Sequence, residues 1–147
     1  MGLDPAFGSS NFGVCITELV DGQVNIVHAE EYPRRDFNRM IETTVKLLRK
    51  YDITFNNSYP SIYDLEFLQQ NMFVILVPFV KEHKRMLAHT KELMEYKNGP
   101  VCINLTFNKL VIALRTAIEN GEGSLDKDGI SHDDLFDSFR LSLMFWH

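Results

Sequence analysis

The pattern of apolar and polar residues divides the chain into short strands and helices, starting with a hairpin. Two segments rich in β-favouring residues, 12–19 and 23–31, lie on either side of Asp21-Gly22. Asp-Gly is a preferred dipeptide for a tight turn between antiparallel strands. The stretch from 12 to 31 is therefore predicted to form a β-hairpin.

Apolar residues recur at helical spacing in five later segments, which are predicted to be helices. Asp36, Thr106 and Ser131 each precede such a segment, and all three are good N-cap residues. Two of the helices are expected to end near Asn98-Gly99-Pro100 and Asn120-Gly121. In chain order, the expected helices cover residues 37–48, 61–70, 81–96, 107–118 and the segment that follows Ser131.

Between the helices lie three short apolar runs that are typical of strands. They read "DITF" (residues 52–55), "MFVILVPFV" (72–80) and "VCINL" (101–105). The second run is continuous, as expected of a strand that is buried on both faces. A polar loop, "NNSYP", is expected after the first run.

A hairpin followed by alternating strands and helices predicts a single α/β domain, with a mixed sheet and helices on both of its faces. The ribonuclease-H-like fold has this order of elements. Only Met1, Gly2 and Leu3 precede Asp4, which is too few residues for an ordinary first strand. We therefore expect the first strand to be incomplete and the chain to be part of a longer protein.

Composition and charge exclude some classes of protein. The chain has 147 residues, of which 45% are hydrophobic, and this is enough for one core. Its formal net charge of −5 argues against binding of nucleic acid by bulk electrostatics, but not against a nuclease. No apolar run is long enough to cross a bilayer, and no signal peptide is recognisable. Cys15 and Cys102 lack metal-ligand spacing, so a reduced, intracellular protein is expected.

Acidic residues near the two ends of the chain are the strongest candidates for chemistry. On a helix, Asp133, Asp134 and Asp137 would share one end of one face, where like charges repel one another. The helix dipole relieves this repulsion in the first turn, but less well at Asp137. Asp4 lies in an Asp-Pro-x-x-Gly pattern, for which a turn is the simpler interpretation. If Asp4 and Asp134 meet, two cations such as Mg²⁺ could bridge a phosphodiester.

Three stretches of the sequence resemble the nuclease domain of viral terminase large subunits, and especially terminase-like proteins of archaea and their viruses. They read "LDPAFGSSNFG", "VPFVKEHKRMLAHTKELMEYKNGPVCINLTFNKLVIALRTAIENGEGSLDK" and "SHDDLFDSFRLSL". The resemblance covers nearly the whole chain. It implies a ribonuclease-H-like fold and a divalent-metal-dependent endonuclease. Such an enzyme cuts the double-stranded DNA of concatemeric viral genomes before and after they are packed into a capsid.

The same resemblance implies partners and a location. In the family, an ATPase motor domain precedes the nuclease domain, and we expect this chain to lack it, because no GxxxxGK[ST] phosphate loop occurs. Double-stranded DNA, the portal and the small terminase subunit are the other implied partners. The implied location is the cytoplasm of the host cell, with no membrane contact.

By position, the metal-binding and catalytic roles of the family fall on acids at both ends of this chain. The ligand on the first strand falls on Asp4, and the ligand on the C-terminal helix falls on Asp134, with Asp133 and Asp137 able to share or replace it. The remaining acid of the family falls on Asn56 or, as an alternative, on Asn57. An amide oxygen can ligate Mg²⁺ or Mn²⁺, but its lack of charge lowers the affinity. This departure leaves open an inactive or weakly active module that docks DNA or the packaging machinery.

Basic residues supply candidates for DNA binding. Lys81, Lys84, Arg85 and Arg115 could hold phosphates, which fixes the position of DNA without reading its sequence. A solvated helix face is the simpler interpretation for any one of them. His132 could shuttle a proton or contact a phosphate, although a histidine at a helix start is more often merely exposed. A nuclease of the same fold with another task, such as junction resolution, is a third possibility.

Overall fold

The computed structural model describes most of the chain. Its described residues are 1–5, 11–33, 36–53, 59–60, 77–95, 100–117, 123, 129–144 and 146, with the backbone alone at 37, 59 and 60. The predicted helix 61–70, most of the predicted strand 72–80 and Asn56 lie outside these residues.

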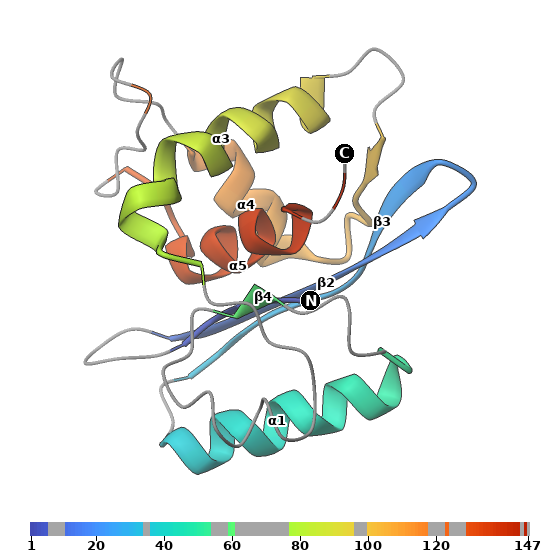
Figure 1. Cartoon of the computed structure of the whole chain (residues 1–147), viewed down its shortest axis with the longest axis vertical. Helices are drawn as coiled ribbons and strands as arrows, with labels where there is room; N and C mark the ends of the chain where they lie inside the picture. Colours follow the sequence, from blue (N-terminus) through green and yellow to red (C-terminus); the bar gives the residue numbers. More distant parts are fainter. Residues whose placement is uncertain are drawn as a thin grey trace.

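A mixed sheet forms the middle layer of the structure, and helices cover both of its faces (Figure 1). In chain order, the elements are β1 (Gly2–Asp4), β2 (Phe12–Val20), β3 (Gln23–Tyr32), α1 (Phe37–Lys50), β4 (Tyr59–Pro60), α3 (Phe79–Glu95), β5 (Val101–Cys102), α4 (Asn108–Thr116) and α5 (Asp133–Leu143). The strand order is β4-β1-β2-β3-β5. The first three strands pair antiparallel, whereas β4 and β5 lie parallel to β1 and β3. Helix α1 covers one face and α3, α4 and α5 cover the other, which confirms the predicted α/β class.

The hairpin and the first helix follow their sequence signals. Strands β2 and β3 pair around a turn in which Asp21 and Gly22 have positive φ angles of 51° and 78°. A two-residue turn of this kind matches the twist of the flanking strands, which explains the Asp-Gly dipeptide. Asp36 caps α1 by accepting a hydrogen bond from the Arg39 backbone N–H at 2.9 Å. Both predictions are confirmed.

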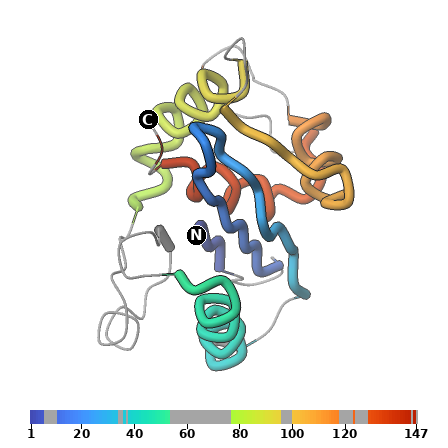
Figure 2. Tube along the Cα trace, turned by 90° about the vertical axis from the view of Figure 1, so that its right-hand side faces the viewer, coloured from blue at the N-terminus to red at the C-terminus, as the bar shows by residue number. Residues whose placement is uncertain are grey.

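Strand β1 is short but central, because it has a partner on each side. Its three residues pair with β2 and with β4, and a strand of this length agrees with the expectation that the residues up to Asp4 form less than an ordinary strand. Leu3 is buried in the core on the α1 side. Gly2 faces α5 so closely that an added Cβ atom would collide with the Ser138 carbonyl. Figure 2 shows the N-terminal strand beside the hairpin, and α5 packs against both β1 and β2.

Several element boundaries differ from the predictions. Helix α3 begins at Phe79, inside the run predicted as a strand, and the Pro78 carbonyl accepts a hydrogen bond from the Glu82 N–H at 3.0 Å. A continuous apolar run does not distinguish a strand from a buried helix, and proline suits a helix start. Strand β4 falls within the expected "NNSYP" loop, because its backbone pairs with β1. Strand β5 covers two residues of the predicted five.

The predicted N-caps Thr106 and Ser131 are both wrong by one residue. Phe107 is the N-cap of α4, and the Thr106 backbone N–H donates to Asn104 Oδ1 at 2.9 Å within a turn. His132 is the N-cap of α5. Helix α4 also ends earlier than predicted, because the backbone is already extended at Ala117.

Two apolar cores lie on the two faces of the sheet. The core on the α1 side contains Met1, Leu3, Phe12, Val14, Ile16, Met40, Ile41 and Leu47. The core on the α5 side contains Cys15, Val24, Ile26, Ala29, Leu93, Leu110, Leu135, Phe139 and Leu143. None of the helices in the described ranges is both long enough and apolar enough to pass through a bilayer.

Gly2→Ala is expected to lower the free energy of unfolding by about 1–3 kcal/mol, because the added methyl group forces the α5 backbone away from β1. Urea denaturation measures the change. Glu18→Ala, at an exposed position of β2, is the control and should change stability by less than about 0.5 kcal/mol. Equal stability of Gly2→Ala and the wild type would contradict direct packing of the helix on the strand.

Candidate functional site

Three residues on neighbouring strands form a row beneath the start of α5. Asp4 on β1 and Glu31 on β3 both pair with Gly13 on β2. Directly paired residues point to the same face of a sheet, and neighbouring strands are about 4.8 Å apart. The two acidic side chains therefore lie on the α5 face, on either side of a residue that has no side chain.

Gly13 is the point at which the start of the helix meets the sheet. A Cβ atom built on Gly13 would collide with the Asp134 carbonyl and would lie 3.1 Å from the Leu135 backbone nitrogen. Only glycine leaves room for the first turn of α5 here. The fold thus brings Asp4, from one end of the chain, and Asp134, from the other end, to the same glycine.

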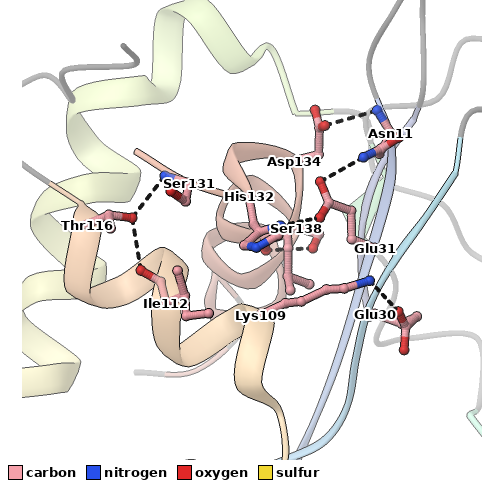
Figure 3. Close-up of polar contacts among 11 residues, drawn as sticks. Asn11, Glu30, Glu31, Lys109, Ile112, Thr116, Ser131, His132, Asp134 and Ser138 are labelled. Carbon is pink, nitrogen blue, oxygen red and sulfur yellow. Dashed lines mark hydrogen bonds and ion pairs between the residues drawn. The ribbon is translucent and has the colours of Figure 1, made fainter. Parts of the chain in front are cut away.

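Asn11 links two of the acids at this site. Its backbone N–H donates to Asp134 Oδ2 at 3.0 Å, and its side-chain Nδ2 donates to Glu31 Oε1 at 3.1 Å (Figure 3). The other oxygen of Glu31, Oε2, accepts a hydrogen bond from His132 Nδ1 at 2.6 Å. These contacts join the residue before β2, strand β3 and the start of α5, and they fix the spacing of the two carboxylates.

Burial and neighbouring charge raise the pKa of Asp134 from 3.8 to about 6. Partial desolvation is the largest cause, and the negative charges of Asp133, Glu31 and Asp137 add to it. The hydrogen bond from Asn11 acts in the opposite direction. A carboxylate in this environment favours the approach of a cation, and such perturbed groups cluster at functional sites.

The acids at this site suit a hard divalent cation, because Mg²⁺ and Mn²⁺ prefer carboxylate oxygens. Mg²⁺ commonly takes one or two protein carboxylates and completes its shell with water and phosphate oxygens. Within the described ranges, no three His, Cys, Asp or Glu side chains are already arranged to hold a metal ion. Both oxygens of Glu31 are engaged in hydrogen bonds in this arrangement.

Asp137 lies one turn further along α5, where it forms a buried ion pair with Arg140. Arg140 is fully buried, and its guanidinium lies 5.0 Å from the centroid of the Phe79 ring and 5.2 Å from that of Phe136. The pair therefore helps to join α5 to α3. This contact gives Asp137 a structural role, and its catalytic role stays a prediction.

The predicted DNA contacts lie on two helices that cover the same face of the sheet as α5. Lys81, Lys84 and Arg85 are exposed on α3, and Arg85 forms an ion pair with Glu82. Arg115 is exposed in the last turn of α4. Their exposure leaves them accessible to phosphates, and their role in binding DNA stays a prediction.

Asn11 and Glu31 are the site residues that sequence analysis missed. A two-residue turn at 21–22 with regular pairing would place Glu30, not Glu31, opposite Gly13. The observed pairing shifts by one residue at Val27, which is the extra residue of a β-bulge. Because side chains alternate along a strand, this bulge turns Glu31 to the α5 face.

Comparisons with known proteins gave no match. No family model matches the sequence, and neither the curated proteins nor the solved structures gave a match. Function is therefore argued from the site, and the resemblance to terminase nuclease domains enters as a proposal.

Asp134→Asn is expected to remove a pH dependence of stability. An acid whose pKa is raised on folding binds its proton more tightly in the folded state, so stability falls as pH rises from about 4 to about 6. The wild type should lose stability relative to Asp134→Asn across this range, and the difference should be constant above it. Urea denaturation at several pH values measures it, and a difference that does not change with pH would contradict the raised pKa.

Arg140→Met is expected to lower the free energy of unfolding by about 3–5 kcal/mol, because it leaves the Asp137 carboxylate buried without its partner. The double variant Arg140→Met/Asp137→Leu should recover most of this loss, since it buries no charge. Urea denaturation of the single and double variants measures both effects. If the double variant loses as much stability as the two single variants lose together, the ion pair does not couple the two residues.

Proposed function

We propose that this chain is a divalent-metal-dependent endonuclease domain with a ribonuclease-H-like fold, which cuts double-stranded DNA during viral genome packaging. The observation that carries the proposal is that Asp4 and Asp134 both lie next to Gly13. Asp134 lies near the like charges of Asp133, Glu31 and Asp137, which costs stability. Such an arrangement suggests a catalytic or metal-binding use more than a structural one.

Asp4 and Asp134 are the proposed metal ligands, and Asp133 or, less strongly, Asn56 would assist them. A bound pair of Mg²⁺ or Mn²⁺ ions would activate water and stabilise the leaving oxygen of a phosphodiester. The resemblance to terminase nuclease domains implies products with a 5′-phosphate and a 3′-hydroxyl. Asn11 contributes by donating a hydrogen bond from its backbone N–H to one oxygen of Asp134. This bond orients the carboxylate over the row of strand residues that contains Gly13.

The architecture and the basic residues support this proposal. Strands β1, β2 and β3 pair antiparallel, β4 lies parallel to β1, and helices cover both faces of the sheet, an arrangement that is compatible with a ribonuclease-H-like fold. The exposed Lys81, Lys84 and Arg85 on α3, together with Arg115 on α4, would bind phosphates of the duplex. Phosphate contacts position DNA without reading its bases, which suits an enzyme that needs little sequence specificity.

The terminase resemblance also supports a cellular setting. In the full-length protein, an ATPase motor domain would precede this nuclease domain. The portal and the small terminase subunit would be its partners, in the cytoplasm of the host cell. The nuclease would then cut the DNA that the motor translocates.

A plasmid-nicking assay tests the proposed activity. With Mn²⁺ or Mg²⁺, the wild type should convert supercoiled plasmid into nicked and linear forms, and EDTA should stop the reaction. Asp4→Asn and Asp134→Asn should each lower the rate by roughly 100-fold or more, because metal ions contribute several kcal/mol to such reactions. Thermal denaturation of each variant checks that it is folded.

The matched control for these substitutions is Asp21→Asn, the same change in the turn at the other end of the hairpin. It should cut like the wild type, because asparagine accepts the positive φ at this position. Cutting that survives both Asp4→Asn and Asp134→Asn would contradict the proposed metal site. No cutting by the wild type would contradict the nuclease function.

A non-catalytic module that docks DNA or the packaging machinery is the second candidate. It is favoured by Asn56 in place of an acid. It is also favoured because no three ligand side chains of the described residues are already arranged for a metal ion. Such a module should bind duplex DNA with strong salt dependence and leave it uncut in Mn²⁺. A gel-shift titration run beside the nicking assay separates the two candidates.

A further inference from the structure

The first turn of α5 is held mainly from outside the helix. No side-chain capping bond forms at His132 among the contacts of the described residues, and its backbone is left-handed, with φ 56° and ψ 48°. A residue other than glycine is strained in this conformation, so its surroundings must hold it there. One such contact runs to α4, where Thr116 Oγ1 accepts a hydrogen bond from the Ser131 N–H at 2.9 Å.

The remaining contacts form a closed ring that includes Asp134 (Figure 3). His132 Nδ1 donates to Glu31 at 2.6 Å, Glu31 accepts from the Asn11 side chain, and the Asn11 backbone donates to Asp134. The covalent chain from His132 to Asp134 closes the ring. Glu31 has only 8% of its surface exposed, so its position is fixed by packing as well as by hydrogen bonds.

We propose that His132 and Glu31 are positioning residues, whose hydrogen bond sets the place of the Asp134 carboxylate in the site. This inference rests on the proposed function, which gives Asp134 its importance. Glu31 belongs to the row that crosses Gly13, and His132 lies two residues before Asp134. Their bond therefore clamps the helix start onto Gly13, and its loss would let Asp134 move away from Asp4.

The clamp requires a hydrogen-bond donor at the place of Nδ1. It does not require a charge on the ring. A neutral imidazole with its proton on Nδ1 can donate this bond. An asparagine carries its amide nitrogen as many bonds from Cα as Nδ1 is, and it tolerates the left-handed backbone. Glycine tolerates that backbone even better but brings no donor. His132→Gly and His132→Asn thus separate the clamp from backbone strain and from proton transfer by the ring.

The experiment compares the wild type, His132→Gly and His132→Asn by three measurements. They are kcat and KM for DNA cleavage in Mn²⁺, the affinity for Mn²⁺ by calorimetry, and hydrogen exchange of the Phe136 amide. That amide makes the first bond of the helix, to the His132 carbonyl at 3.0 Å. Thermal denaturation confirms that each variant is folded.

For His132→Gly we expect kcat to fall roughly 10- to 100-fold with little change in KM, because a small misplacement of a site group costs about this much. Its Mn²⁺ affinity should fall, and its Phe136 amide should exchange faster. For His132→Asn we expect all three quantities to return close to those of the wild type.

Two results would overturn the proposal. One is that the His132→Gly variant cuts DNA like the wild type and that its Phe136 amide exchanges at the wild-type rate. The other is His132→Asn that is as defective as His132→Gly, since the ring would then matter more than the Nδ1 contact. A wild type that neither cuts DNA nor binds Mn²⁺ defeats the proposed function instead. In that case Phe136 exchange still decides whether the clamp holds the helix start, and unchanged exchange in His132→Gly refutes the clamp.

Discussion

Direct contact between the backbone of α5 and two strands is the constraint on which the rest of the structure depends. At Gly2 on β1 and at Gly13 on β2, even a methyl group would strike the helix. With no side chain between them, the helix lies close against both strands, and its first turn comes to rest over the row of Asp4, Gly13 and Glu31. Asp4 and Asp134, from the two ends of the sequence, therefore both lie next to Gly13, because two glycines leave room for a helix.

Helix α5 is buried between the sheet and the other helices on the same face, and this burial determines how its two acids Asp134 and Asp137 are stabilised. Asp137, in the middle of the helix, has Arg140 as its counterion, and the two groups neutralise each other away from water. Asp134, one turn earlier, is partly buried among like charges, and its pKa is raised by desolvation and, to a smaller extent, by those charges. A cation bound from solution would neutralise the charge of Asp134, as Arg140 neutralises that of Asp137. The same helix thus contains Asp137, which is paired with a cation and serves the fold, and Asp134, which has no cationic partner among the described residues and is the proposed metal ligand.

Features that depend on neighbours in sequence could be predicted from sequence alone. The turn at Asp21-Gly22, the cap at Asp36 and the mixed sheet between helices all follow from local signals. Features that tertiary contacts decide could not be predicted. The bulge at Val27 shifts the pairing of β3 and brings Glu31 to the site, although Glu30 fits regular pairing equally well. The terminase resemblance singled out the acids at both ends of the chain, but only the packing at the two glycines explains how they meet.

Anomalous scattering from a crystal soaked in Mn²⁺ tests the central claim most directly. The account predicts a Mn²⁺ peak between Asp4 and Asp134, with one oxygen of each carboxylate within about 2.2 Å of the ion. Absence of Mn²⁺ from this position at full soaking concentration would contradict it. Carboxylates of Asp4 and Asp134 that lie on opposite faces of the sheet would contradict it equally.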